Sequence, residues 1–316
     1  MSKTLINTLT INPAIDHIIY LNHFTPNITN RAVGATDVLG GKGTHVSVNL
    51  GILNCSNNAY GIDYGKTGLK IESMLQAAKV NVRFIHKEGN ESRTNYALIE
   101  NDATCTLVTE PSKKIPEQIC MELVSKISKE LNDGDILVLS GDASNTEVPH
   151  LYNIILDQLN EKKTDIKIFL DSSSDSLIEG IKRNPFLIKP NEDELSQILG
   201  HKINNEQEII SGLLSLAQKG ITCIALTCGE NGSYVYYQKN LYRIFPLSVN
   251  AVNTIGCGDA FLSGMAYGFE KHLTFIDTLR WAACVSAATA ESNSTVGFEL
   301  TRANELFNKV KIEIIS

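Results

Sequence analysis

The sequence lacks the features that mark nucleic-acid-binding, membrane and secreted proteins. Its 316 residues include 35 acidic and 28 basic ones, and the net charge of −7 leaves no broad basic surface for nucleic acid or an anionic membrane. No apolar run approaches the roughly 18 residues that span a bilayer. The first residues lead into a strand-like pattern without the layout of a signal peptide. We therefore expect a cytoplasmic protein that binds neither nucleic acid nor membrane and holds anionic ligands with a few local cations.

The cysteines do not form the pattern of a disulfide framework or a zinc site. There are seven, they are scattered, and no two have Cys-x-x-Cys spacing. Reduced thiols in a cytosolic protein fit this pattern best. Cys257 lies inside a glycine-rich motif, but no neighbouring residue supplies a base. We therefore interpret it as a small filler residue rather than a nucleophile.

Two common nucleotide-binding motifs are also absent. The nearest approach to a Walker A loop, residues 61–67, is one residue short between its glycines. No Gly-x-Gly-x-x-Gly motif follows the first predicted strand, residues 4–11. This absence argues against a dinucleotide-dependent oxidoreductase.

Predicted strands and helices alternate regularly from about residue 115. The strands are expected at residues 135–139, 166–170 and 185–188, and the helices at 117–131, 147–159 and 174–181. Alternation of this kind implies a parallel sheet covered by helices on both faces. A hydrophobic fraction of 43% suits one large α/β domain with an appendage. The irregular residues 17–38 predict one or two small strands outside the main sheet.

The stretch Asn-Thr-Ile-Gly-Cys-Gly-Asp at residues 253–259 precedes a helix-like apolar run. Its glycines expose backbone amides, and a helix start adds free N–H groups and the positive end of a dipole, which together suit a phosphate. A carboxylate there, Asp259, can accept a proton from an attacking hydroxyl. The alternative interpretation is a glycine-rich turn in which Asp259 caps the helix.

Four upstream segments also have features that suit a ligand site. Glycines around Lys42 open a predicted helix, where the lysine adds a mobile positive charge. Asn191 and Glu194 have capping-box spacing, but Glu194 also suits a Mg²⁺ ion and its waters. Asp16 follows Pro13 and is expected near the end of the first strand, as a ligand group or a turn residue. Arg93 begins a predicted strand, as a solvated residue or a forked anion clamp.

In this order, the motifs resemble those of the PfkB (ribokinase-like) family of sugar kinases over nearly the whole chain. The matching segments are Asn-Pro-Ala-Ile-Asp at 12–16, Gly-Gly-Lys-Gly at 40–43, Lys-Pro-Asn-Glu-Asp-Glu-Leu at 189–195 and the motif at 253–259. The first segment, and the Asn that begins the last, resemble the 1-phosphofructokinase and tagatose-6-phosphate kinase branch. The resemblance implies a three-layer α/β/α fold with a mainly parallel central sheet. It also implies a β-sheet lid at about residues 17–37 and 92–109, through which family members often form homodimers.

The chemistry implied by the resemblance is transfer of the ATP γ-phosphoryl group, with Mg²⁺, to a hydroxyl of a ketohexose phosphate. Asp259 would be the general base, and the amides of Gly256, Cys257 and Gly258 would form the anion hole. The substrate-binding residues implied are Asp16, Gly41, Lys42, His45 and Arg93. The nucleotide-binding residues that the resemblance implies are Lys189, Asn191, Thr227, Gly229 and Gly232. Glu194 would order Mg²⁺ through water.

Two positions depart from the family pattern near the expected acceptor. His45 stands where the family usually has Asn, whose amide reads sugar hydroxyls, and a neutral imidazole does part of that task with a different reach. Asp142 replaces a hydroxyl near the substrate phosphate, which is unfavourable unless Arg93 or Lys42 offsets its charge. A kinase of an unphosphorylated sugar or related alcohol therefore stays open as an alternative. A non-catalytic sugar-phosphate sensor on the same fold is another, although the intact Asp259 argues against it.

Overall fold

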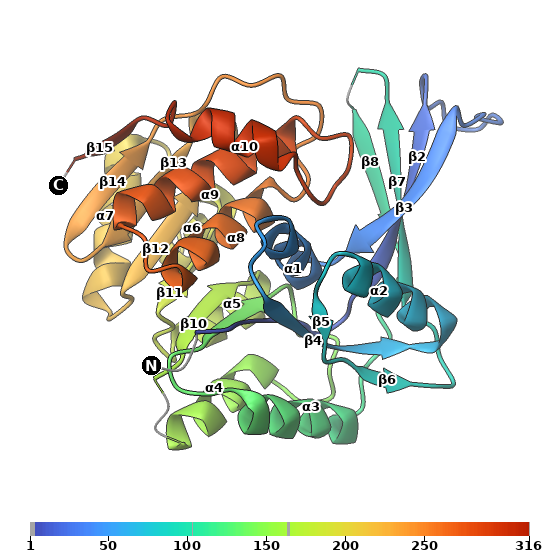
Figure 1. Ribbon diagram of the computed structural model, residues 1–316, viewed down its shortest axis with the longest axis horizontal. Coiled ribbons are helices and arrows are strands. Elements are labelled where there is room, and N and C mark those ends of the chain that lie inside the picture. The colour runs from blue at the N-terminus through green and yellow to red at the C-terminus, as the bar shows by residue number, and fades with distance from the viewer. Residues whose placement is uncertain (1–3, 103, 163–164, 316) are drawn as a thin grey trace.

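A central sheet organises the computed structural model, which describes residues 4–102, 104–162 and 165–315 (Figure 1). Among these residues, eleven strands form the sheet. In spatial order they are β15 (Ile312–Ile314), β14 (Asn240–Ile244), β13 (Ser233–Tyr237), β12 (Cys223–Thr227), β11 (Leu187–Ile188), β10 (Lys167–Asp171), β9 (Ile136–Ser140), β1 (Ile6–Thr10), β4 (Asn57–Tyr64) and β5 (Asn81–Val82), with β6 (Ile85–Lys87) also pairing β4. The pairings from β12 to β4, and those of β4 with β5 and β6, are parallel, whereas β13, β14 and β15 continue the sheet antiparallel.

Helices cover both faces of this sheet. One layer contains α3 (Glu117–Glu130), α4 (Leu151–Glu161), α5 (Ser174–Ile181), α6 (Glu192–Leu199) and α7 (Glu206–Gln218). The other contains α1 (Lys42–Ile52), α2 (Gly65–Ala77), α8 (Cys257–Glu270), α9 (Phe275–Ala290) and α10 (Leu300–Phe307). The three-layer fold with a mainly parallel sheet is confirmed. No helix in the described ranges has both the length and the apolarity to cross a membrane.

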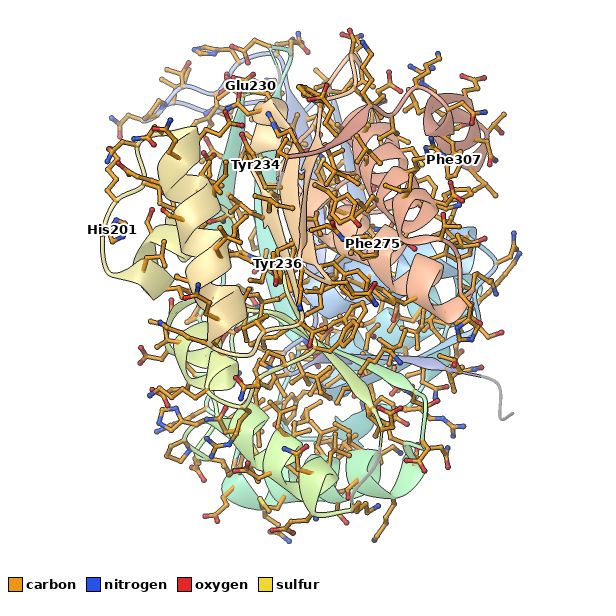
Figure 2. All side chains as sticks on the ribbon, turned by 90° about the vertical axis from the view of Figure 1, so that its left-hand side faces the viewer. His201, Glu230, Tyr234, Tyr236, Phe275 and Phe307 are labelled. Atoms are coloured by element: carbon orange, nitrogen blue, oxygen red, sulfur yellow. The ribbon has the colours of Figure 1, made fainter. Side chains whose placement is uncertain are left out.

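The two layers exist because side chains alternate across each strand. In β9, Leu137 and Leu139 pack into the core beneath α3 and α4, whereas Ile136 and Val138 pack into the core beneath α8 and α9. The same alternation separates the tyrosines of β13, because Tyr234 and Tyr236 pack into the first core and Tyr237 packs into the second, against Phe275 of α9. Figure 2 shows Tyr234 and Tyr236 on one side of the sheet and Phe275 on the other. Strands that are apolar on both faces are the expected pattern for a covered parallel sheet.

The strand order reverses direction at β1. Its neighbours are β4 on one side and β9 on the other, so the chain leaves β1 toward one half of the sheet and later fills the other half. In open α/β sheets, such a reversal opens a crevice at the carboxyl ends of the strands, where ligands bind. Thr10 ends β1 at this point.

A separate four-stranded sheet, here called the small sheet, projects from one end of the molecule (Figure 1). Its order is β3 (Gly34–Gly40), β2 (Ala14–Leu21), β7 (Arg93–Glu100) and β8 (Cys105–Thr109). The position expected for Asp16, near the end of the first strand, is wrong. β1 ends at Thr10, before Pro13, the chain enters β2 at Ala14, and Asp16 is the third residue of this new strand.

Two local predictions also differ from the structure. The helix expected at 147–159 begins only at Leu151, because His150 takes a left-handed backbone conformation with φ 52°. The strand expected at 82–86 is divided into β5 and β6. A short 3₁₀ turn, Gly229–Asn231, joins β12 to β13.

Candidate active site

A cavity of about 1210 Å³ lies at the carboxyl ends of the parallel strands. Its walls come from the segments after β1, β9, β11 and β12, the starts of α1 and α8, and β7 of the small sheet. Of the site residues expected from the sequence, all except Asp16 line it. They are Gly41, Lys42, His45, Arg93, Lys189, Asn191, Glu194, Thr227, Gly229, Gly232, Gly256, Cys257, Gly258 and Asp259.

The glycine motif forms the start of α8. Gly256 has φ 77°, and a Cβ at this position would lie 2.3 Å from the carbonyl oxygen of Thr295, so only glycine fits. The first turn of a helix leaves amide N–H groups without intrahelical partners, which makes this end a suitable anion site. Burial, with a smaller contribution from Asp259, raises the pKa of the Cys257 thiol to about 11. The thiol is therefore protonated at neutral pH, in keeping with a filler role.

Asp259 stands in the first turn of α8 with only 7% of its surface exposed. Its Oδ2 lies 2.7 Å from Nδ1 of His45, and Nε2 of His45 lies 2.9 Å from the carbonyl oxygen of Leu39. Both ring nitrogens of His45 are thus engaged by protein atoms, whereas the sequence predicts that the ring reads a sugar hydroxyl. The second oxygen of Asp259, Oδ1, remains for a ligand in the cavity.

Two lysines at the cavity share one buried carboxylate that the sequence analysis missed. Oδ1 of Asp171 lies 3.1 Å from Nζ of Lys42 and 3.3 Å from Nζ of Lys189. Burial opposes the charged form of Asp171, but Lys189 and Lys42 outweigh it and hold the pKa of Asp171 below its ordinary value. Asp171, with help from Asp259 and Glu194, raises the pKa of Lys42 against the effect of burial. Lys42 is therefore a permanent cation at the cavity wall.

Lys189 brings its charge to the glycine motif. A Cβ built on Gly258 would lie 3.2 Å from Nζ of Lys189, so the ammonium is adjacent to the start of α8. Glycine at position 258 leaves room for this approach.

Glu194 serves as a helix cap and also faces the cavity. Its Oε2 accepts a hydrogen bond from the Asn191 amide, and the Asn191 side chain accepts one from the Glu194 amide, which completes the capping box predicted from the spacing. Its Oε1 lies 3.8 Å from Nζ of Lys42. One carboxylate of this kind, with waters and substrate phosphates, fits the way Mg²⁺ is usually held.

The small sheet contributes polar groups to one end of the cavity. Arg93 donates from Nη2 to the Asn12 carbonyl at 3.3 Å, and its buried Nε has no hydrogen-bond partner among the described residues. Asn95 lines the cavity and donates to Oδ1 of Asp16 at 2.8 Å. Asp16 therefore lies behind Asn95 rather than at the cavity surface.

Asp142 lies on the cavity wall after β9. Its carboxylate accepts hydrogen bonds from the hydroxyls of Ser176, at 2.9 Å, and Ser144. These bonds stabilise its negative charge.

The residues that sequence reasoning missed had weak but identifiable patterns. Asp171 directly follows the strand predicted at 166–170, so the strand-end position was informative. Asn95 lies two residues after Arg93 and therefore shares its face of β7. The α9 residues that complete the wall, Ala283, Ser286, Ala287 and Ala290, are small and belong to none of the motifs found in the sequence.

Comparison with known proteins identifies the family. The model described as "pfkB family carbohydrate kinase" matches residues 10–301. The 1-phosphofructokinase of Haemophilus influenzae is 31% identical over 315 residues, 98% of each chain. The tagatose-6-phosphate kinase of Staphylococcus epidermidis is 27% identical over 311 residues, 98% of this chain and 99% of that one. The solved structure of Escherichia coli phosphofructokinase-2 in complex with substrates and products has a TM-score of 0.90 at 20% identity, over 97% of this chain and 99% of that one. The chain therefore belongs to the pfkB family of carbohydrate kinases.

Proposed function

We propose that this protein is an ATP-dependent kinase that phosphorylates a hydroxyl of a ketohexose phosphate. The observation that carries the proposal is one cavity that unites a carboxylate at a glycine-rich helix start with Lys42, Arg93 and Lys189. Three cations suit two phosphorylated substrates. The names of the relatives, 1-phosphofructokinase and tagatose-6-phosphate kinase, support this acceptor class.

In the proposed reaction, Oδ1 of Asp259 accepts the proton of the acceptor hydroxyl. The hydroxyl oxygen forms a bond to the γ-phosphorus while the bond to the β-phosphate bridging oxygen breaks, and ADP leaves. The amides of Gly256, Cys257 and Gly258 stabilise charge on the transferred group, where preorganised donors contribute most. Lys189 adds its ammonium beside Gly258.

The nucleotide and its metal occupy the β11–β12 side of the cavity in this proposal. Thr227, Gly229 and Gly232 line the nucleotide, and Asn191 and Lys189 approach its phosphates. Glu194 would hold Mg²⁺ through water, and the ion would neutralise charge on the phosphates. The small α9 residues on the cavity wall would leave room for the base.

The sugar phosphate occupies the side of the cavity next to the small sheet. Arg93 and Lys42 hold its phosphate, Gly41 allows close approach, and Asp16 acts through Asn95, to which it is hydrogen bonded. The small sheet closes over the sugar as a lid, which excludes water and limits ATP hydrolysis.

We further propose a homodimer formed through the small sheet. Its β8 strand is exposed throughout and presents Leu107 and Val108 with 53% and 54% of their surface accessible. Apolar side chains on an edge strand favour pairing with a second copy.

We also propose a cytoplasmic location. The free thiols that support it are Cys105, Cys120, Cys223, Cys228, Cys257 and Cys284.

ADP release with a panel of acceptors tests the function. We expect turnover with fructose 1-phosphate or tagatose 6-phosphate, and at least about a 10³-fold lower kcat in Asp259→Asn, with ATP binding retained. Turnover of unphosphorylated sugars alone would favour the second candidate acceptor, which Asp142 on the cavity wall motivates. Sugar-phosphate binding without ADP release under any condition would favour the sensor, and near-normal turnover in Asp259→Asn would overturn the role of Asp259.

A further inference from the structure

The hydrogen bonds of His45 constrain the protons on its ring. The carbonyl oxygen of Leu39 can only accept, so Nε2, which lies 2.9 Å from it, carries a hydrogen. A neutral ring would then direct the lone pair of Nδ1 at Oδ2 of Asp259 across 2.7 Å, which is repulsive if the carboxylate is ionised. The contact is favourable only when a proton lies between Nδ1 and Oδ2. The His45–Asp259 pair then holds one more proton than it would with a neutral imidazole and an ionised carboxylate.

The charges around His45 favour placing this proton on the ring. Burial disfavours the imidazolium, but the hydrogen bond to Asp259 and the charges of Asp259 and Asp16 outweigh burial and raise the pKa of His45. These two carboxylates come from α8 and β2, and β3 contributes the Leu39 carbonyl. Both hydrogen-bond partners of the ring that the described residues supply are therefore acceptors, and Asp16 adds a second negative charge. The start of α8 at Gly256 also borders Nδ1, and Lys42, on the same helix as His45, interacts with Asp259. A charge-assisted bond between a buried imidazolium and a carboxylate is stronger and more directional than a neutral one.

We propose that His45 is a positioning residue that acts as an imidazolium: it holds Oδ2 of Asp259 and thereby directs Oδ1 at the acceptor hydroxyl. This proposal rests on the proposed kinase function, since Asp259 is the base there. The bond from His45 fixes the carboxylate orientation before substrate arrives, so less reorganisation is needed in the transition state. His45 itself touches no substrate, because both of its ring nitrogens are occupied within the protein.

The proposal gives the enzyme an alkaline limb in its pH profile. Because the imidazolium is the competent form, kcat/KM is full below the raised pKa of His45 and falls as pH rises through it. Deprotonation leaves a lone pair facing Oδ2, and the carboxylate loses its orientation. A residue that only fills space at position 45 would produce no such limb.

Histidine NMR tests the protonation state without any need for turnover. In protein labelled with ¹⁵N-histidine, the resonances absent from His45→Asn identify residue 45. We expect both of its nitrogens to be protonated at pH 7, and the ring to lose its proton at a lower pH in Asp259→Asn. A neutral His45 ring throughout pH 6 to 8 in the unmodified protein would overturn the proposal. Because this readout is independent of activity, it separates failure of the proposal from failure of the kinase assignment.

Steady-state kinetics test the consequence. His45→Ala is expected to lower kcat about 10- to 100-fold, the effect of losing one charge-assisted hydrogen bond, with the acceptor KM changed less than about threefold. His45→Asn restores a neutral amide donor, so we expect it to recover part of kcat and to lack the alkaline limb.

The matched control is His86→Asn, which removes a different His–Asp pair, outside the cavity, with 3.1 Å between His86 Nδ1 and Asp63 Oδ1. It should keep the limb. An unchanged limb in His45→Asn would contradict the proposal.

Discussion

Asp171 and Asp63 are two carboxylates with no exposed surface, both at the carboxyl-terminal parts of strands in the central sheet. Each has an Oδ2 that lacks a hydrogen-bond partner among the described residues. They differ in what faces Oδ1. Asp171 faces the ammonium groups of Lys42 and Lys189, whereas Asp63 faces His86, with the Glu72 carboxylate nearby.

The pKa values of the two carboxyl groups move in opposite directions. The lysines hold the pKa of Asp171 below its ordinary value, whereas burial and then the charge of Glu72 raise the pKa of Asp63 to about 6, against the opposing effect of His86. Burial alone would raise both. The difference teaches that the charged partners, and not the depth, decide the direction in which the pKa of a buried carboxyl group moves, and that the carboxylate held by two cations lies beside the cavity.

The largest expected effect comes from removing the charge of Asp171. Asp171→Asn leaves two lysines at the cavity without their shared counter-ion, so we expect kcat/KM to fall about 10²- to 10³-fold and the free energy of unfolding to fall by about 3 kcal/mol. Urea denaturation and ADP-release kinetics measure the two quantities.

The pKa of Asp171 is lowered by folding, so its stabilisation is complete above its unfolded pKa of about 4 and is lost only below that. The deficit of the variant should therefore be constant from pH 5 to 8, and a deficit that grows across this range would contradict the ion-pair account.

A smaller effect is expected from removing one of the two lysines. In Lys42→Met, Asp171 keeps Lys189 as a partner, so the fold should lose only about 1 kcal/mol, whereas the acceptor phosphate loses a cation. We expect kcat/KM for a sugar phosphate to fall about 100-fold, mainly through KM. Lys66→Met, which removes an exposed lysine outside the cavity, is the control. An unchanged KM in Lys42→Met would place the phosphate elsewhere.

Asp63→Asn should affect stability with the opposite pH dependence. Because folding raises the pKa of Asp63 to about 6, the native state binds a proton that the unfolded state releases near pH 4, and stability falls as pH rises from 4 to 6. Asparagine removes this fall, so the variant should gain about 2 kcal/mol relative to the parent between pH 4 and pH 7. Denaturant midpoints across this range measure the gain. If the difference in stability between the variant and the parent is the same at pH 4 and at pH 7, Asp63 does not titrate in this range.

The smallest effect is expected at His86. Its ring is a quarter exposed and pairs with both Asp63 and Glu88. Folding raises its pKa, against the opposing effect of burial, so its contribution is present at low pH and is lost as pH rises above about 6.5. His86→Asn should therefore cost less than about 1 kcal/mol at pH 5 and close to nothing at pH 9, because exposed pairs are weak. Thermal unfolding at the two pH values measures this, and an equal loss at both would indicate a packing role for the ring.

The sequence predicts those parts of the fold and the site whose contacts join residues close together in the chain. The capping box of Asn191 and Glu194 and the helix start at Gly256 follow from residues only a few positions apart, and the alternation after residue 115 predicted the layers. The bond between His45 and Asp259 joins residues 214 positions apart. Such pairs depend on the register of the parallel strands and on the packing of α1 against α8, which no local spacing encodes.

The junction between the small sheet and α1 illustrates the same limit. The sequence predicts that a helix opens at the glycines around Lys42, where α1 begins, but not that β3 ends directly before it at Gly40. Only Gly41, with φ 104°, separates the two elements. Its left-handed backbone makes the tight connection, and a Cβ there would lie 2.9 Å from Thr10 Cγ2.

This junction has a kinetic consequence. In the proposed closure, a rotation of the small sheet would displace the first turn of α1, and Lys42 would move with it. Closure over a sugar and approach of Lys42 to its phosphate would then be a single motion rather than two successive ones, whereas the His45–Asp259 bond is already formed. Two sugars could bind with equal affinity and yet close the sheet to different extents. They would then be phosphorylated at different rates, so the enzyme would discriminate between acceptors through kcat as well as through binding affinity.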